Sequence, residues 1–432
     1  MLIEEIYKIY QQFPSIQTDT RKLQQDDLFF ALKGPNFNGN LYAAEALNKG
    51  AAYVFVDEEI TFTDKRVIQT ENALETLQDL AHFHRQQFNT LRGGKSDIPF
   101  IAITGSNGKT TTKELLHAVL STTYKTYTTE GNLNNHIGIP LTILKVKPDA
   151  QIVVIEMGAN HLHEIAGYCE YAMPNYGLIT NIGKAHLEGF GSVENVKKGK
   201  GELFDYLRNN EGKAFVNSDD AAVVALTNDL NKKVFYGISG KDYRGKIIKS
   251  DPFPEIQVEG EPPINIQTNL AGDYNFANVL AAVAIGKYFK IENKKIKIAI
   301  ENYRPSNSRS QLIKIGSNTV ILDAYNANPG SMKAAIENFA NLKGASKILL
   351  LGSMMELGKE SKKEHADLIS LINQFKWEKV VLVGKNFNEL DHDYISYENS
   401  SQAKEWLEDQ HFENTMMLIK GSRSMQMEKV LE

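Results

Sequence analysis

The chain has very little cysteine: Cys169 is the only one among 432 residues, so no disulfide can form within the chain. Proteins without disulfides are typical of reducing compartments, and the sequence therefore predicts a cytoplasmic protein. No nucleophile motif surrounds Cys169. We interpret it as a packed thiol, because free cysteine usually behaves as a small apolar side chain.

Long apolar runs and an excess of positive charge are also missing. The richest apolar run, residues 279–286, is far shorter than the ~20 residues of a membrane span, so none is expected. Glu4 and Glu5 stand where a secretory signal would be positive, so export is not predicted. Lys and Arg number 48 against 53 Asp and Glu, a net charge of −5, so nucleic acid is not an expected partner.

The remaining composition is that of a folded protein with several domains. Apolar residues make up 42% and charged residues 23% of the chain, and its length fits about three domains. Two stretches of turn-forming residues divide it, at 91–97 (LRGGKSD) and 304–310 (RPSNSRS). We therefore predict domains over residues 1–95, 96–304 and 305–432.

Helices and strands are predicted to alternate within each of these domains. Strands are expected at 27–32, 52–57, 100–103, 152–155, 177–180, 214–217, 319–322, 347–351, 380–383 and 416–419, and helices at 40–49, 72–88 and 332–342. A further helix after the glycine-containing loop is expected to carry Leu115, Leu116, Val119 and Leu120 on one face. This order predicts an α/β protein with a mixed N-terminal domain and doubly wound, mostly parallel sheets in the central and C-terminal domains. In such sheets, ligands bind at the carboxyl ends of the strands.

The strongest local motif is the stretch 103–114 (ITGSNGKTTTKE), between a predicted strand and a predicted helix. Glycines and the helix N-terminus suit phosphate binding, Lys109 can reach the terminal phosphates, and Thr110 can bind Mg²⁺. The alternative is a glycine-rich turn with an exposed lysine, but the flanking elements favour a phosphate loop. Ile103 replaces the first glycine of the common pattern, so this loop is the shorter variant.

Two later residues, Glu156 and His186, are candidates for metal binding. Glu156 ends a predicted strand, where it can bind Mg²⁺; the alternative is a capping or solvated carboxylate. His186 fits equally well as a ligand of a second ion or as a partner of a loop carbonyl. By composition alone, Lys200 is predicted to be an ordinary solvated lysine.

Three further residues are candidates for nucleotide binding. Asn275 and Asn278 lie one turn apart at the start of an apolar helix, where they can contact a purine or cap the helix. Arg309 lies in the second turn-rich stretch, where it can bind a phosphate or form an exposed salt bridge.

Together, twelve motifs cover nearly the whole chain. They are DTR (19–21), FALKG (30–34), FNG (37–39), TGSNGKTT (104–111), GNLNNHIGIPLT (131–142), EMGAN (156–160), NIGKAHLEGFG (181–191), GKGE (199–202), NFAN (275–278), DAYNANP (323–329), MELG (355–358) and KGSR (420–423). In this order they resemble the Mur ligases of bacterial peptidoglycan synthesis. The resemblance implies an N-terminal domain for the UDP end of the substrate, a central phosphate-loop ATPase domain and a Rossmann-like C-terminal domain that closes over the site.

The resemblance also implies a reaction. Mur ligases form an amide with ATP, through an acyl phosphate that an incoming amine attacks, and release ADP and phosphate. The first three and last three motifs are similar to those of the members that join D-alanyl-D-alanine to UDP-N-acetylmuramoyl-tripeptide, which gives the pentapeptide precursor of the cell wall. These two substrates are the expected partners, and a monomer is expected.

Residue roles follow from the same resemblance. The residues expected to bind the ATP phosphates are Gly105, Ser106, Asn107, Gly108, Lys109, Thr110 and Thr111. Asn275 and Asn278 are expected to contact adenine, Asp323 the ribose and Arg309 the γ-phosphate. Two Mg²⁺ ions are expected, one at Thr110 and Glu156, the other at His186 and a carbamylated Lys200. Substrate binding is expected at Asp19, Thr20, Arg21, Lys33 and Gly34 for the UDP-sugar and at Asn134, Tyr325 and Asn326. The expected catalytic residues are Lys109, His186, Lys200 and Asn135.

Three residues depart from the family pattern. Ser353 replaces a usual Asp, Tyr274 a common His, and Asn40 another common His. The alternatives are a sibling ligase that adds one amino acid, a folylpolyglutamate-type ligase, a regulatory phosphate-loop ATPase and a non-catalytic nucleotide-binding protein. The motif at 19–21 argues against the folate alternative, which lacks a UDP-sugar domain. Whether the third tripeptide residue is lysine or diaminopimelate stays open.

Overall fold

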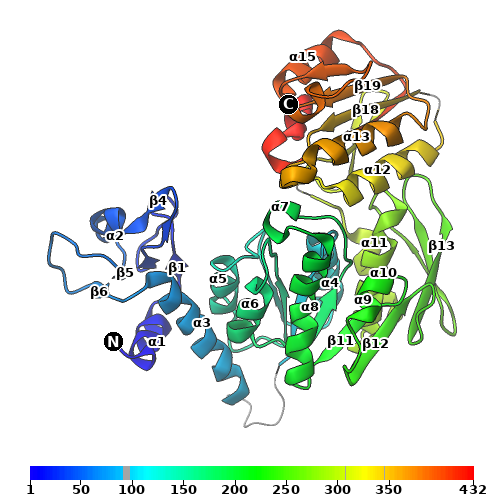
Figure 1. The fold of residues 1–432 in the computed structure, drawn as a ribbon. Coiled ribbons are helices and arrows are strands. Elements are labelled where there is room, and N and C mark those ends of the chain that lie inside the picture. Colours follow the sequence, from blue (N-terminus) through cyan, green and yellow to red (C-terminus); the bar gives the residue numbers. More distant parts are fainter. Residues whose placement is uncertain (91–97, 307, 345) are drawn as a thin grey trace.

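The computed structural model describes residues 1–90, 98–306, 308–344 and 346–432. It contains three α/β regions, each built around its own main sheet (Figure 1). The predicted α/β class is confirmed. The first predicted domain boundary, at 95/96, lies outside the described residues. The second, at 304/305, follows the helix α11 (Asn293–Asn302).

The N-terminal region is a small parallel sheet with helices around it. Its main sheet has the order β1 (Ile16–Gln17), β2 (Leu28–Phe30), β5 (Tyr53–Val56) and β6 (Val67–Gln69). Around it lie the ribbon β3 (Lys33–Gly34) and β4 (Phe37–Asn38), and the helices α1 (Ile3–Gln12), η1 (Gly39–Tyr42), α2 (Ala43–Asn48) and α3 (Ala73–Thr90). Phe30 and Phe55, from the two predicted strands, stack at 4.3 Å in its core.

The predicted helix at 40–49 is two shorter helices. The Asn38 side chain accepts a hydrogen bond from the Asn40 amide at 3.0 Å, which starts the short η1 before α2 begins. The helix α3 packs against α1 and also against α5 (Gly138–Leu144) and α6 (Glu164–Ala172) of the central region. It therefore joins the N-terminal sheet to the central one.

The central sheet has nine strands. Their order is β15 (Ile264–Gln267), β14 (Glu255–Val258), β13 (Tyr243–Lys249), β12 (Lys232–Gly237), β11 (Lys213–Asn217), β10 (Tyr176–Ile179), β7 (Phe100–Thr104), β9 (Ile152–Glu156) and β8 (Thr126–Thr128). The strands from β13 to β8 are mutually parallel, as predicted. The antiparallel extension by β14 and β15 is absent from the sequence prediction.

Helices cover both faces of this sheet. They are α4 (Lys109–Leu120), α5 (Gly138–Leu144), α6 (Glu164–Ala172), α7 (Leu187–Phe190), α8 (Val193–Asn209), α9 (Ala221–Ala225), η2 (Asp273–Asn275), α10 (Phe276–Tyr288) and α11 (Asn293–Asn302). The apolar run 279–286 is the interior of α10, where every side chain is buried. This explains why the run has no polar face.

The C-terminal region carries a six-stranded sheet of order β16 (Gln311–Ile315), β17 (Asn318–Asp323), β21 (Thr415–Lys420), β18 (Ser346–Gly352), β19 (Lys379–Val383) and β20 (Ile395–Tyr397). Its helices are α12 (Pro329–Asn341), η3 (Gly358–Glu360), α13 (Ser361–Ile372), α14 (Lys385–Asn388), α15 (Ser400–Asp409), η4 (Arg423–Met425) and η5 (Met427–Leu431). All strands except β16 are parallel. The region lies above α7 of the central region (Figure 1), where η3 contacts α7 and α12 contacts η2.

In the described ranges of the chain, no helix has the length and hydropathy that a membrane crossing requires.

Candidate functional site

The loop between β7 and α4 requires glycine at two positions. Gly105 has φ +140°, and a Cβ there would lie 2.0 Å from the Thr180 hydroxyl oxygen. Gly108 has φ +78°, and a Cβ there would lie 2.5 Å from Asn278 Oδ1. Both glycines therefore let the backbone turn tightly at the N-terminus of α4, where anions bind.

Residues after β10 hold this loop in place. The Asn107 amide donates to Asn181 Oδ1 at 3.0 Å, and the Thr180 hydroxyl donates to the Asn107 carbonyl at 2.6 Å. Ser106 Oγ and the Gly183 amide are 2.9 Å apart. The sequence analysis assigned no role to Thr180 or Asn181; their place at the carboxyl end of a strand beside β7 is the signal that could have found them.

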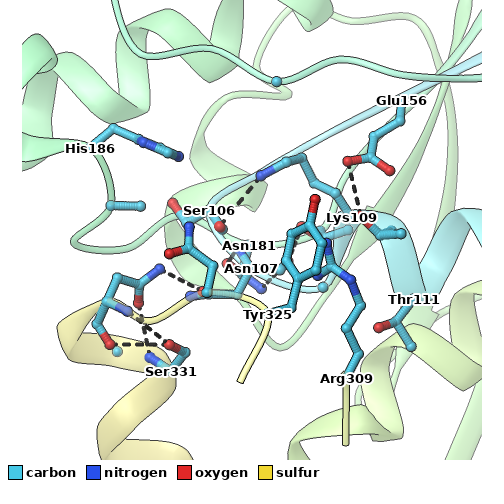
Figure 2. A pocket seen from close by; sticks show the side chains of 18 of the residues that line it. Ser106, Asn107, Lys109, Thr111, Glu156, Asn181, His186, Arg309, Tyr325 and Ser331 are labelled. Atoms are coloured by element: carbon cyan, nitrogen blue, oxygen red, sulfur yellow. Dashed lines mark hydrogen bonds between the residues drawn. The ribbon is translucent and has the colours of Figure 1, made fainter. Parts of the chain in front are cut away.

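Lys109 begins α4 and extends across the site between Glu156 and His186 (Figure 2). Its Nζ donates to the Gly105 carbonyl at 2.7 Å. Burial lowers the pKa of this amine, and nearby Glu156 opposes the effect. Phosphate groups at this loop would act in the same direction as Glu156, because an opposite charge favours the ammonium form.

The Glu156 carboxylate is buried at the end of β9 and is only partly satisfied. Its Oε1 accepts from the Thr110 hydroxyl at 3.1 Å and from the Asn134 amide at 2.7 Å. Its Oε2 is buried without a hydrogen-bond partner among the described residues, and Lys113 Nζ lies 3.9 Å away. Glu156 is buried and accepts from two side chains instead of helix amides, so the solvated or capping alternative is wrong. A carboxylate with a free oxygen beside a hydroxyl suits a hard cation.

Lys113 was not singled out by the sequence analysis. Its ammonium is buried and donates to the Thr129 carbonyl at 2.8 Å and the Gly131 carbonyl at 3.2 Å. Lys113 therefore fixes the loop that leads to Asn134. Lys113 lies four residues after Lys109 on the same helix, which places both side chains on one face. This spacing was the sequence signal that Lys113 lies beside the site.

His186 lies at a contact between the central and C-terminal regions. Its Nδ1 is 2.5 Å from Glu356 Oε2, and the Glu188 amide donates to the Glu356 carbonyl at 3.0 Å. His186 lowers the pKa of the Glu356 carboxyl, which burial opposes. The sequence analysis quoted Glu356 in a motif but gave it no role, because nothing local indicates its distant partner.

The prediction from composition that Lys200 is solvated is wrong. The side chain is fully buried on α8, and its Nζ donates to the Ala159 carbonyl at 2.8 Å. The Phe190 ring lies 5.2 Å from the same nitrogen. Burial lowers the pKa of this amine well below its usual value, and Lys109 adds to the effect.

Residues expected at adenine, ribose and the γ-phosphate line the other side of the site. Asn278 Nδ2 donates to Asn275 Oδ1 at 3.1 Å, so the two amides are linked. Asp323 accepts from Lys420 Nζ at 2.6 Å. The Arg309 guanidinium stacks on the Tyr325 ring at 3.5 Å and forms no salt bridge with the described residues, so the salt-bridge alternative is not observed.

A cavity of about 660 Å³ joins these groups. The expected site residues that line it are Ser106, Asn107, Gly108, Lys109, Thr110, Thr111, Asn134, Asn135, Glu156, His186, Asn275, Asn278, Arg309, Asp323, Tyr325 and Asn326. Gly105 and Lys200 do not line the cavity themselves but contact residues that do. Gly105 accepts a hydrogen bond from Lys109, and Lys200 donates one to Ala159. The side-chain amide of Asn328, in the C-terminal region, donates to Asn107 Oδ1 at 2.7 Å across the cavity.

The expected UDP-sugar residues do not line this cavity; they are Asp19, Thr20, Arg21, Lys33 and Gly34. The Arg21 guanidinium donates two hydrogen bonds to the Asp19 carboxylate, at 2.9 and 2.7 Å, and the Arg21 backbone amide donates a third at 3.0 Å. Lys33 forms an ion pair with Glu58. The structure thus leaves this group on the N-terminal sheet, apart from the phosphate loop (Figure 1).

The three departures from the family pattern are accommodated by local hydrogen bonds. Ser353 Oγ donates to the Val383 carbonyl at 3.3 Å, and the Tyr274 hydroxyl lies 3.1 Å from Ser310 Oγ. Asn40 Nδ2 donates to Asp57 Oδ1 at 2.7 Å. Cys169 is buried, which raises the pKa of its thiol and agrees with a packed side chain.

The described residues contain no group of three or more His, Cys, Asp and Glu side chains placed to hold a metal ion. A cation at Thr110 and Glu156 would therefore take its other oxygen ligands from phosphates and water, which is the usual situation of Mg²⁺ in nucleotide sites.

Comparisons with known proteins cover most of the chain. The family model described as Mur ligase middle domain matches residues 103–286. The model of the Mur ligase glutamate ligase domain matches residues 308–423, and that of the Mur ligase family catalytic domain matches residues 12–85.

Individual relatives are similar over nearly their whole length. A UDP-N-acetylmuramoyl-tripeptide–D-alanyl-D-alanine ligase of Bacillus subtilis is 32% identical, over 96% of this chain and 92% of the relative. The Escherichia coli protein of the same name is 33% identical, over 96% and 92%. A crystal structure of MurF from Acinetobacter baumannii superposes with a TM-score of 0.87 at 27% identity, and covers 98% of this chain and 97% of that one.

Proposed function

The chain belongs to the Mur ligase family, and from this membership we propose that it joins D-alanyl-D-alanine to UDP-N-acetylmuramoyl-tripeptide with ATP, giving ADP and phosphate. The product is the UDP-linked muramoyl pentapeptide used in cell-wall synthesis. The use of ATP and a UDP-linked substrate fits a cytoplasmic reaction. We also propose the domain limits 1–95, 96–304 and 305–432 and a monomeric enzyme.

The observation that carries the proposal is the cavity of about 660 Å³ in which phosphate-loop residues of one region meet Arg309, Asp323 and Tyr325 of the next. An ATPase site enclosed by a second region can exclude water. An acyl phosphate needs this exclusion, because water would hydrolyse it before the amine arrives.

In the first step, a terminal carboxylate oxygen of the tripeptide attacks the γ-phosphorus of ATP, and the bond to ADP breaks. Lys109 and Arg309 stabilise the charge on the transferred group. The 105–108 loop holds the other phosphates through its amides. Asn134 and Asn135 lie on the Glu156 side of the same cavity, where we propose that they position the carboxylate.

In the second step, the free amine of D-alanyl-D-alanine attacks the acyl carbon. The bond to phosphate breaks, phosphate leaves with one former carboxylate oxygen, and the amine loses a proton. Asn326 and Tyr325 lie in the wall from which this substrate would approach. Enclosure by the C-terminal region orients the amine toward the acyl carbon.

Thr110 and Glu156 would hold one Mg²⁺, which would neutralise charge on the phosphates when bound. The unpartnered Oε2 of Glu156 supports this site. We propose a second ion at His186 and Lys200. Burial lowers the pKa of the Lys200 amine, which favours the neutral form that reacts with carbon dioxide. The resulting carbamate would be an anionic oxygen ligand of the kind Mg²⁺ prefers.

We propose that Asp19, Thr20, Arg21, Lys33 and Gly34 bind the UDP-sugar. Their distance from the phosphate loop fits a long substrate that spans the N-terminal and central regions. A Cβ on Gly34 would meet nothing within 4 Å, so the ribbon leaves open space at that point.

The assay for this function is phosphate release by the purified protein with MgATP and UDP-N-acetylmuramoyl-tripeptide. We expect release to require D-alanyl-D-alanine and to stay at background with single D- or L-amino acids. Release with a single amino acid would indicate a sibling ligase. Release without either substrate would indicate a regulatory ATPase, and no release under any condition a non-catalytic nucleotide-binding protein.

A further inference from the structure

The helix α13 of the C-terminal region forms an ion pair with the central region. Its Glu364 carboxylate accepts a hydrogen bond from Lys184 Nζ at 2.5 Å, and Lys184 lies in the loop after β10. The Glu364 side chain is 5% exposed and that of Lys184 is 44% exposed, so the pair is partly shielded from water. The pair can form only while the two regions are in contact.

The loop that carries Lys184 is already attached to the phosphate loop. The Gly183 amide donates to Ser106 Oγ at 2.9 Å, one residue before Lys184. His186, two residues after Lys184, lines the cavity. An ion pair at Lys184 therefore holds the C-terminal region against a segment that is fixed to the phosphate loop.

Two strained residues meet near this ion pair. His186 has φ +52° and Glu356 has φ +60°, in the left-handed region that residues other than glycine rarely adopt. Beside Glu356, the Met354 amide donates to His365 Nε2 at 3.0 Å, and His365 follows Glu364 on α13. Strained backbone persists where the surrounding structure holds it. The helix α13 thus holds both loops, through Glu364 on the His186 side and through His365 on the Glu356 side.

We propose that the Lys184–Glu364 ion pair is a latch that keeps the C-terminal region closed over the site, with Lys184 and Glu364 as positioning residues. The consequence for catalysis rests on the proposed function. A closed latch excludes water from the acyl phosphate until the amine arrives. With the latch open, water attacks the acyl carbon, the bond to phosphate breaks and a proton is released. The tripeptide carboxylate is regenerated, so the net reaction is hydrolysis of ATP to ADP and phosphate.

The test reverses the charges of the pair in the full-length protein. Lys184→Glu and Glu364→Lys each bring like charges together, whereas the double variant restores opposite charges in exchanged positions. In each single variant, we expect the ratio of open to closed protein to rise about tenfold, between the effects of exposed and buried ion pairs. Phosphate should then exceed amide product. The unaltered enzyme and the double variant should release phosphate and amide in equal amounts.

Closure is measured independently by energy transfer between two fluorophores. They are attached to cysteines that replace Lys198 on α8 and Glu405 on α15, both of which are exposed. Cys169 is buried and should not react with the label. With MgATP and UDP-N-acetylmuramoyl-tripeptide, we expect energy transfer to fall in each single variant and to recover in the double variant. This measurement does not require amide formation.

Controls separate the latch from folding and from surface charge. Lys184 is partly exposed in a loop, so Lys184→Glu should keep its melting temperature and tests the latch even where Glu364→Lys does not fold. Lys333→Glu reverses the charge of an exposed lysine on α12, whose partner Glu337 lies 3.7 Å away on the same helix. This variant should leave both energy transfer and the yield of amide per phosphate unchanged.

Two results would overturn the latch. One is a Lys184→Glu protein with unchanged energy transfer and equal amounts of phosphate and amide. The other is a double variant of unchanged melting temperature that does not recover, because the losses would then not arise from the pair. An unaltered enzyme that forms no amide would contradict the proposed function instead, and energy transfer alone would then decide whether the latch exists.

Discussion

Replacing Lys200 with alanine is expected to lower kcat by about 10³-fold, the effect of removing a group that organises charge in an active site. Lys200 is buried, has a lowered pKa and donates to Ala159, whose neighbours line the cavity. Lys200 forms no salt bridge with a described residue, so an ion pair does not explain its burial. Its carbamate would supply an anionic ligand that alanine lacks. The measurement is phosphate release at saturating substrates.

Chemical rescue distinguishes this role from loss of folding. A short-chain carboxylic acid such as acetate, added to Lys200→Ala, should occupy the vacated space and restore activity at least about tenfold, since it returns an oxygen ligand. Lys198→Ala, an exposed lysine on the same helix, should keep full activity and show no response to acetate. Full activity of Lys200→Ala without acetate would rule out the carbamate.

Replacing Lys109 with methionine is expected to lower kcat by about 10³-fold as well, because the transferred phosphoryl group loses a cation. Methionine has a similar length and no charge, so the packing of α4 is kept. The ammonium of Lys109 lies between Glu156 and His186 at the centre of the cavity (Figure 2). We expect a small change in the KM for the dipeptide and a large loss of single-turnover phosphate transfer.

The matched control is Lys125→Met. Lys125 is 60% exposed and lies at the amino end of β8, whereas the phosphate loop follows the carboxyl end of the parallel strand β7. It should leave kcat unchanged. Equal losses in the two variants would show that the effect of Lys109→Met is not specific to the site.

The phosphate loop was predictable from the sequence because strand, glycine turn and helix follow one another within a short stretch. Glu156 was predictable for a similar reason, as the last residue of an apolar strand. The contact of His186 with Glu356 was not, because it joins two regions of the chain and neither residue has a local signal for the other.

The burial of single polar residues could also not be predicted from local sequence patterns. Lys200 has polar neighbours in sequence, and only the packing of α8 shows that its amine is removed from water. The resemblance to the Mur ligases assigned it a role that composition did not. The strands β14 and β15 escaped prediction because they extend a parallel sheet in the antiparallel sense, with only short, partly exposed apolar runs.

The most direct measurement of the proposed reaction follows the oxygen atoms. The tripeptide substrate is prepared with oxygen-18 in its terminal carboxylate, and the phosphate released in the presence of MgATP and D-alanyl-D-alanine is analysed by mass spectrometry. An acyl phosphate requires one labelled oxygen in each phosphate, in step with the amide product. Unlabelled phosphate, released at a rate that does not depend on the dipeptide, would contradict the proposed ligase reaction. It would indicate an ATPase in which water attacks the γ-phosphorus.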